Sequence, residues 1–263
     1  MATLYLVRHG QAGFGQAEYD VLSTLGATQA QALGRYFVMA QRPIDRLWSA
    51  PRKRHRATCD SLCLGLQAAG LDIAGLWPAG IDSGPHIVEG FDEFPFAEIL
   101  TTTCGPGGCL ETDYAALLRE LEGRNPLHDG RAFGRLFRMA MPRWAHGEVE
   151  VSESFQAFCT RIESTLRRVA TAAAELPSGH GAVLVTSAGA IAAALRFLLG
   201  VDAQTMLQLC LALYNTGVTE LRVRKTSEDA QDRAATDRAA IEVSLISMNG
   251  VPHLLEPSHR TFR

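Results

Sequence analysis

Reactive side chains stand directly after an apolar run near the beginning of the chain. Residues 4–7 (LYLV) are followed at once by Arg8, His9 and Gly10. A run this short, with β-branched and aromatic residues and a glycine to stop it, predicts a buried strand rather than a helix. A cation and an imidazole at the carboxyl end of such a strand would lie where open α/β sheets bind ligands. The alternative is a strand that simply ends at the surface with an exposed Arg-His pair.

Three further segments carry reactive residues where predicted strands end. They are 49–56 (SAPRKRHR), Glu93, and 186–189 (TSAG). If the strands are parallel, these groups share one rim of the sheet with Arg8 and His9. Arginine matches the oxygens of phosphate, and unpaired amides at a helix start attract anions. Nearby cations would also lower the pKa of an imidazole, so that its neutral, nucleophilic form prevails. The set predicts a phosphate site.

The elements that must position these residues alternate between strand and helix. Strands are predicted at 3–8, 44–50, 182–187, 217–224 and 241–248, with a strand or strand-like loop at 87–94; helices are predicted at 22–40, 56–70, 152–176 and 190–200. Ser152 or Ser154 is expected to cap the third of these helices. Alternation of this kind, without an internal repeat, predicts an α/β fold: a three-layer α/β/α sandwich around a mainly parallel central sheet.

Two stretches depart from this alternation. Residues from about 95 to 150 lose strand character and gain glycines, charges and short helical pieces, which predicts a helical cap insertion. The connection at about 226–239 is charged and poor in apolar residues, and we expect it to be mobile. The whole of 1–263 is then a single domain with one insertion.

Composition limits the classes of function. The chain has 263 residues, is 47% hydrophobic and has a formal net charge of -3. It can bury a full core, and it has no general attraction for nucleic acid or an anionic membrane, so a bound anion must be held by a local cluster. A strand at 3–8 leaves no room for a signal peptide, and no apolar stretch has the length of a membrane span, so we expect the cytoplasm. We expect a small phosphorylated substrate or phosphate as the partner, with a homodimer left open.

The six cysteines are expected to be free thiols, because a long chain without a secretion signal seldom carries a disulfide framework. Cys104 and Cys109 bracket GPGG, but the matching ligand pair of a zinc site is missing. We therefore expect neither a metal nor another cofactor.

Several sequence motifs occur in an order typical of one protein family. They are LVRHGQA at 6–12, DVLSTLGATQA at 20–30, SAPRKRHRAT at 49–58 and YNTGVTEL at 214–221. Together they resemble the histidine phosphatase superfamily, which has the phosphoglycerate mutase-like fold. The resemblance covers most of the chain outside the expected insertion and the charged connection.

The resemblance implies a role for each matching residue. His9 would attack phosphorus and become phosphohistidine, with Arg8 as the first phosphate ligand. Arg54, followed four residues later by Thr58, matches the second arginine of the family. The implied substrate-binding residues are Arg8, Gln11, Arg54, Ser187 and Ala188.

A carboxyl group must give a proton to the leaving oxygen. The resemblance implies Glu93 for this role, with Glu89 as the alternative. A bound phosphate dianion would raise the pKa of this carboxyl while the arginines would lower it.

The chain departs from the family at the end of the strand at 182–187. The family usually has a second histidine before a glycine there, and this chain has Ala188 before Gly189. Losing one such donor typically costs roughly 10²–10³ in rate. Ser187, Thr186 or the amides near Gly189 are the candidate replacements.

Two classes of function follow. The first is a phosphomonoester hydrolase, a histidine acid-type phosphatase that acts through phospho-His9, with low turnover expected from Ala188. The second is a phospho-ligand binding or regulatory pseudo-phosphatase. A phosphoglycerate mutase fits less well, because 11–15 (QAGFG) has neither the Trp nor the Asn of that class.

Other polar and aromatic residues could line the pocket or serve only the fold. Arg52 and Arg56 are expected to be solvated, and His55 stands in the basic segment. Four residues of the expected insertion could contact a substrate, but a helix with a mixed polar and apolar face would explain them equally well. They are Phe133, Arg135, Phe137 and Arg138.

Overall fold

The computed structural model describes residues 1–13, 20–76, 84–122, 124–226 and 241–262. Most of the charged connection predicted at 226–239, and part of the 11–15 stretch, lie outside the described residues. The strands are β1 (Ala2–Arg8), β2 (Ile44–Ser49), β3 (His86–Ile87), β4 (Gly181–Thr186), β5 (Val218–Lys225) and β6 (Ile241–Gly250).

The strands form one sheet in the order β3-β2-β4-β1-β5-β6. The pairs β3/β2, β2/β4 and β4/β1 are parallel, whereas β1/β5 and β5/β6 are antiparallel. Only β5 therefore runs against the other described strands. The predicted mainly parallel α/β sheet is confirmed.

Strand β1 is apolar on both faces because both faces are covered. Leu4 and Leu6 belong to one buried cluster, and Tyr5 and Val7 belong to the other. Strand β4 alternates in the same way. A central parallel strand buried on two sides reads as a continuous apolar run, which is the pattern of residues 4–7.

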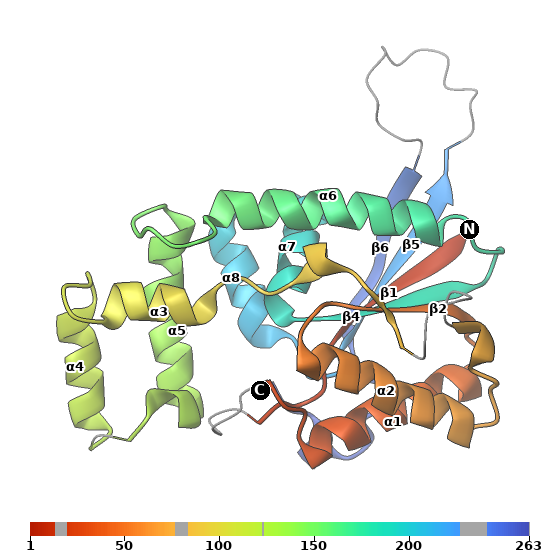
Figure 1. The fold of residues 1–263 in the computed structure, drawn as a ribbon, viewed down its shortest axis with the longest axis horizontal. Helices are drawn as coiled ribbons and strands as arrows, with labels where there is room; N and C mark the ends of the chain where they lie inside the picture. The colour runs from red at the N-terminus through yellow and green to blue at the C-terminus, as the bar shows by residue number, and fades with distance from the viewer. Residues whose placement is uncertain (14–19, 77–83, 123, 227–240, 263) are drawn as a thin grey trace, which may run out of the picture.

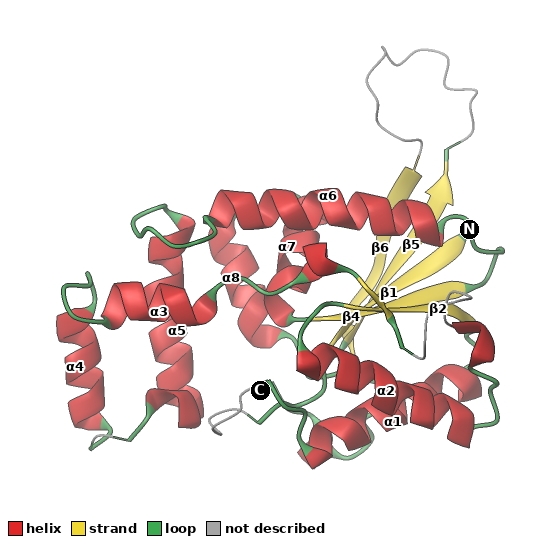
Figure 2. Ribbon diagram, in the orientation of Figure 1, coloured by secondary structure: helices red, strands yellow, loops and turns green. Residues whose placement is uncertain are grey.

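Helices cover both faces of the sheet (Figures 1 and 2). In chain order they are α1 (Thr24–Met39), α2 (Lys53–Ala68), α3 (Phe96–Cys104), α4 (Glu111–Glu120), α5 (Gly130–Ala145), α6 (Phe155–Ala173), α7 (Ala188–Leu199) and α8 (Ala203–Ala212). Helices α1 and α2 form one layer, and α6 and α7 lie on the opposite face, which gives the predicted three-layer sandwich.

Two elements differ from the sequence-based expectation. Only His86–Ile87 is a strand in the segment at 87–94, and a 3₁₀ turn, Glu89–Phe91, follows it. Helix α8 has no counterpart among the predicted elements. It begins directly after α7, where Gly200 adopts a left-handed backbone conformation and Asp202 caps the new helix by accepting a hydrogen bond from the Thr205 amide.

Helices α3, α4 and α5 lie beyond the end of the sheet at which β1 finishes (Figure 1). We call residues 96–145 the α3–α5 segment. Phe96, Phe133 and Phe137 pack against one another within it. The segment is helical, as the pattern at 95–150 indicates.

No helix among the described residues is both long enough and apolar enough to cross a membrane.

Candidate active site

Strand register aligns the residues that end β1, β2 and β4. Arg8 pairs with Thr186, and the His9 amide donates to the Thr186 carbonyl at 2.8 Å. Ser49 pairs with Val185, and the amide of Ala50, the residue after β2, donates to the Val185 carbonyl. The reactive segments therefore share one rim, as parallel pairing predicts.

A cavity of about 810 Å³ opens between this rim and the α3–α5 segment. Five of the predicted site residues line it: Arg8, His9, Arg54, Glu93 and Ala188. Ser187 and Gln11 do not belong to its lining, and neither does Glu89, which is exposed beside a different cavity. Between the two carboxyl candidates, the geometry therefore favours Glu93.

His9 is buried and its ring is fixed. Its Nδ1 lies 2.7 Å from the Gly10 carbonyl oxygen, so Nδ1 carries the proton and Nε2 keeps its lone pair. The Gly10 amide in turn donates to Thr58 Oγ1 at 3.0 Å. A Cβ atom at position 10 would lie 2.5 Å from the Gly26 carbonyl oxygen, which explains the glycine. Burial, then Arg54, Arg8 and His55, lowers the pKa of His9 well below its ordinary value.

The loop before β5 holds the end of β1 from the other side. The Thr216 amide donates to the Arg8 carbonyl at 3.0 Å, and Asn215 Nδ2 donates to the His9 carbonyl at 3.2 Å. The Arg8 guanidinium donates to the Leu213 carbonyl. These contacts give a structural role to the YNTGVTEL motif.

Arg54 lies on the first turn of α2, which begins three residues earlier than predicted. Its guanidinium is buried and donates to Asp20 Oδ1 at 2.9 Å and to Ser187 Oγ at 3.2 Å. The Asp20 carboxylate also accepts from the amides of Lys53 and Arg54 and so caps α2. Sequence reasoning missed Asp20, because a cap supplied from a distant loop leaves no local pattern.

Ser187 and His55 form a buried pair behind the cavity. His55 Nε2 lies 2.7 Å from Ser187 Oγ, and the His55 ring centroid is 5.5 Å from that of His9. Burial, then Arg54 and Arg52, lowers the pKa of His55 well below its ordinary value. His55 does not line the cavity, and the hydroxyl of Ser187 faces Arg54 and His55 instead.

Gln11 is placed differently from its predicted role. The backbone amide of Gln11 donates to Gln29 Oε1. The side-chain oxygen of Gln11 accepts a hydrogen bond from the hydroxyl of Ser23, the cap of α1. Gln11 therefore joins two segments of the fold, and its side chain does not reach the cavity lining.

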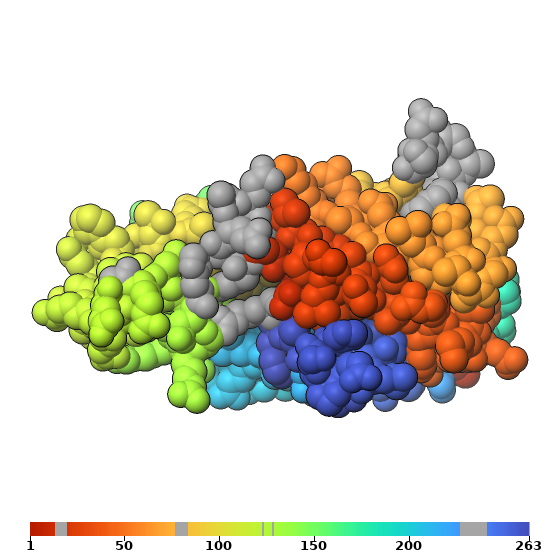
Figure 3. All heavy atoms as spheres, turned by 90° about the horizontal axis from the view of Figure 1, so that it is seen from below, coloured from red at the N-terminus to blue at the C-terminus, as the bar shows by residue number. Residues whose placement is uncertain are grey.

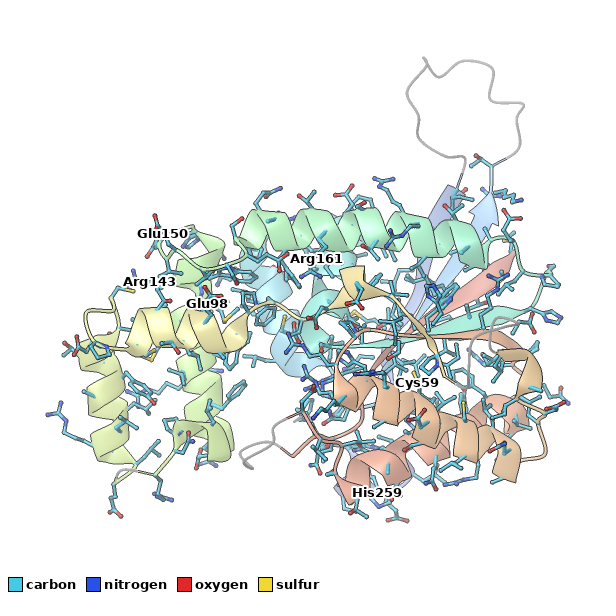
Figure 4. The ribbon with its side chains drawn as sticks, viewed as in Figure 1. Cys59, Glu98, Arg143, Glu150, Arg161 and His259 are labelled. Carbon is cyan, nitrogen blue, oxygen red and sulfur yellow. The ribbon has the colours of Figure 1, made fainter. Side chains whose placement is uncertain are left out.

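The loop that carries Glu93 is clamped on both sides. Arg161 of α6 donates to the carbonyls of Gly90 and Asp92 at 3.0 and 3.1 Å, and it reaches this loop from above in Figure 4. Thr186 Oγ1 donates to the Phe91 carbonyl at 2.7 Å. The loop therefore has a fixed position relative to β4.

Arg52 contributes to the same loop and departs from the expectation of a solvated side chain. It lines the cavity, and its guanidinium binds both carboxylate oxygens of Asp92. Arg56 is exposed, as predicted.

Glu93 lies against the start of α7. A Cβ atom on Gly189 would come within 2.1 Å of Glu93 Oε1, so only glycine leaves room for this carboxyl. Burial raises the pKa of Glu93, while Arg54, Arg52 and the amides of Phe94 and Gly189 oppose the shift. A raised pKa favours the protonated form that a proton donor needs.

Ala188 is the first residue of α7 and lines the cavity together with Glu93 and His9. Its methyl group offers no hydrogen bond to a bound anion. Phe262, near the C-terminus, also lines the cavity and stacks on Tyr214 with ring centroids 4.3 Å apart. The space-filling view shows the C-terminal residues beside the N-terminal segment (Figure 3). Nothing in the sequence of the tail indicated this placement.

A buried imidazole, two arginines and a carboxyl around a cavity at the ends of parallel strands define a phosphate-site architecture on an α/β fold. The chain belongs to the histidine phosphatase superfamily (branch 1), whose family model matches residues 4–74 and 98–235. The match leaves out the segment with Glu93. No curated protein matches the chain.

Solved structures share the fold over nearly the whole chain. A mutant phosphoserine phosphatase from Entamoeba histolytica in complex with phosphoserine is 19% identical, with a TM-score of 0.54, covering 97% of this chain and 100% of its own. A mycobacterial glucosyl-3-phosphoglycerate phosphatase is 20% identical, with a TM-score of 0.52 and coverage of 95% and 99%. An alpha-ribazole phosphatase from Shigella flexneri is 15% identical, with a TM-score of 0.50 and coverage of 95% and 96%.

Proposed function

We propose that this chain hydrolyses phosphate monoesters through a phosphohistidine on His9. Membership of the histidine phosphatase superfamily supports phosphatase activity in general. The observation that carries the finer proposal is the state of His9. Its Nδ1 is held by the Gly10 carbonyl, which leaves the lone pair on Nε2, and His9 lines the cavity together with Arg8 and Arg54.

The first step forms the phosphoenzyme. The lone pair of His9 Nε2 attacks phosphorus, a P–N bond forms and the P–O bond to the alcohol breaks. Arg8 and Arg54 hold the transferring phosphoryl oxygens, where fixed cations stabilise developing charge. Glu93 gives its proton to the leaving oxygen, so that the product leaves as a neutral alcohol.

The second step returns the enzyme to its starting state. Water attacks phosphorus, the P–N bond breaks and its electron pair returns to Nε2. Glu93 takes the proton from the attacking water and is ready to donate again. The net reaction is ester plus water to alcohol plus phosphate.

The test uses His9→Ala. We expect the wild-type protein to hydrolyse a chromogenic phosphate ester and to yield an acid-labile phosphoenzyme after quenching, because phosphohistidine is the intermediate. His9→Ala should lose both signals. His146→Ala is a matched control, because His146 is exposed and lies outside the cavity lining. Retained turnover in folded His9→Ala protein would reject the mechanism.

Ala188 favours a second candidate function. A pocket with its cations in place and one fewer donor can bind a phosphorylated ligand while turning it over slowly. In that case the protein acts as a phospho-ligand sensor. Tight binding of a phosphate ester without turnover or phosphoenzyme would support this candidate over the hydrolase.

Three expectations accompany the proposal. We propose that the α3–α5 segment is a cap over the pocket of one domain, which its share of the cavity lining supports. We propose the cytoplasm as the site of action, which the six free thiols support. A homodimer stays a prediction, to be checked by light scattering.

A further inference from the structure

Aromatic rings wall the part of the cavity that the α3–α5 segment and the loop before it form. Phe94, Phe96, Phe133 and Phe137 all line it. The ring of Phe96 stacks on that of Phe137 at 6.0 Å and an angle of 29°, and it lies 5.6 Å from Phe133. Phe94 meets Phe96 edge-on at 6.2 Å. The four rings form one continuous surface, which we call the aromatic wall.

The aromatic wall is held by the core beneath it. Phe94 and Phe137 are buried, and Phe94 packs edge-on against Phe158 at 5.6 Å. Phe96 and Phe133 are only partly buried and offer the rest of their surface to the cavity. A surface fixed in this way before binding loses little conformational freedom when a ligand arrives.

The cavity is larger than a phosphate group alone would need. Its volume of about 810 Å³ lies within the range of roughly 300–1,000 Å³ that encloses drug-sized molecules. Glu98, which is labelled in Figure 4, also lines the cavity, but both of its carboxylate oxygens accept hydrogen bonds from Ser152. Asn125 and Arg138 also line the cavity, and the aromatic wall supplies its apolar surface.

We propose that the substrate is a phosphate monoester whose alcohol part carries an aromatic or fused-ring group. The phosphate meets His9, Arg8 and Arg54, and the ring lies against Phe96 and Phe133. The proposal rests on the proposed function for the reaction itself, and the aromatic wall decides which ester is preferred.

The test compares two primary alkyl esters, so that the leaving alcohols have similar acidity. We expect kcat/KM for 2-(1-naphthyl)ethyl phosphate to exceed that for 2-hydroxyethyl phosphate by about 30-fold, because the naphthyl ring buries apolar area against the wall. Phe133→Ala should reduce this ratio by about fivefold. Tyr114→Ala should leave the ratio unchanged, because Tyr114 lies in the α3–α5 segment but outside the cavity lining. Thermal melting checks that each variant is folded.

Binding of phosphonates separates this inference from the proposed function, because their P–C bond cannot be hydrolysed. Calorimetry should give tighter binding of 2-(1-naphthyl)ethylphosphonate than of ethylphosphonate, with the difference reduced in Phe133→Ala. Equal binding and equal hydrolysis of the paired compounds would overturn the aromatic preference and leave the hydrolase intact. Preferred binding of the naphthyl compound without hydrolysis of either ester would support the aromatic wall and reject the hydrolase.

Discussion

The carboxyl of Glu93 is balanced between opposing influences. Burial raises its pKa, and Arg54 and Arg52 pull it back. A phosphate dianion placed between the arginines would offset their effect and push the pKa upward again. Glu93 would then hold its proton when the ester is bound and lose it when the alcohol leaves.

Glu93→Gln tests this role through the leaving group. An alkyl ester needs a proton on its leaving oxygen, so its kcat should fall by about 10²–10³. Nitrophenyl phosphate, whose leaving group needs little protonation, should lose less than about tenfold. Steady-state kinetics on both esters measures the difference. Equal losses would assign Glu93 a structural role.

Ala188→His tests the missing imidazole. Ala188 lines the cavity, so a histidine there would add a donor to the transferred phosphoryl group. We expect turnover of a chromogenic ester to rise by about tenfold, the lower part of what one donor contributes. Ala188→Leu adds volume without a donor and should not raise turnover. Unchanged or lower activity in folded Ala188→His protein would mean that other donors already serve this position.

At the scale of elements, the start of α2 depends on a residue from elsewhere in the chain. Asp20 supplies the cap that Arg52, at the N-cap position, does not. The first turn of α2 carries Arg54, so the cap and the site share one carboxylate. Folding of this helix end is therefore coupled to the order of the site.

Asp20→Ala should lower the free energy of unfolding by about 1 kcal/mol, the usual value of a lost cap. Asp20→Asn keeps an acceptor oxygen for the Lys53 amide and should cost about half as much. Urea denaturation of the three proteins gives the comparison. Identical stabilities for all three would remove Asp20 from the capping role.

Prediction from the sequence worked where the signal was local. The apolar run before Arg8 predicts β1 from a few consecutive residues, and a serine before the periodic segment predicts the start of α6. Ser154 is the observed cap of that helix. Helix α8 was missed although its start carries a local signal: Gly200 ends α7 and Asp202 caps α8 within three residues.

The site shows the same division. Arg8, His9 and Arg54 could be placed from motif and register, whereas Phe262 and Asp20 come from segments whose own sequence has no periodic pattern. Their positions follow from tertiary contacts, such as the hydrogen bonds from Gln29 to the C-terminal tail. Contacts between segments far apart in the chain leave no local pattern in the amino-acid sequence.

At the scale of the whole molecule, buried imidazoles couple the fold to pH. The pKa values of His9, His55 and His253 all lie below their ordinary value, chiefly because of burial, and that of His253 is about 4. The unfolded chain titrates these groups near 6.5, so below that pH it binds more protons than the folded chain. Glu93 acts in the opposite sense, because the stability from its raised pKa is lost as pH rises.

Stability should therefore be full above about pH 6.5 and fall as the pH drops toward 4, since three imidazoles outweigh the two carboxyls with a raised pKa, Glu93 and Asp60. Urea denaturation at a series of pH values measures this slope. His253→Gln should make the slope shallower, because it removes one titrating group outside the cavity lining. A stability that rises on acidification over this range would contradict the assignment.

The strand order has a consequence for biosynthesis. Strands β1 and β2 are made first but are not neighbours, because β4 lies between them. Neither can join the other until the ribosome has added residues 181–186. Strand β1 pairs with β4 and β5, so the nascent chain carries it without a neighbouring strand through most of its synthesis. Long-range pairing of this kind is slow and exposed to aggregation. His9, which follows β1 directly, is therefore among the last residues to reach its final surroundings.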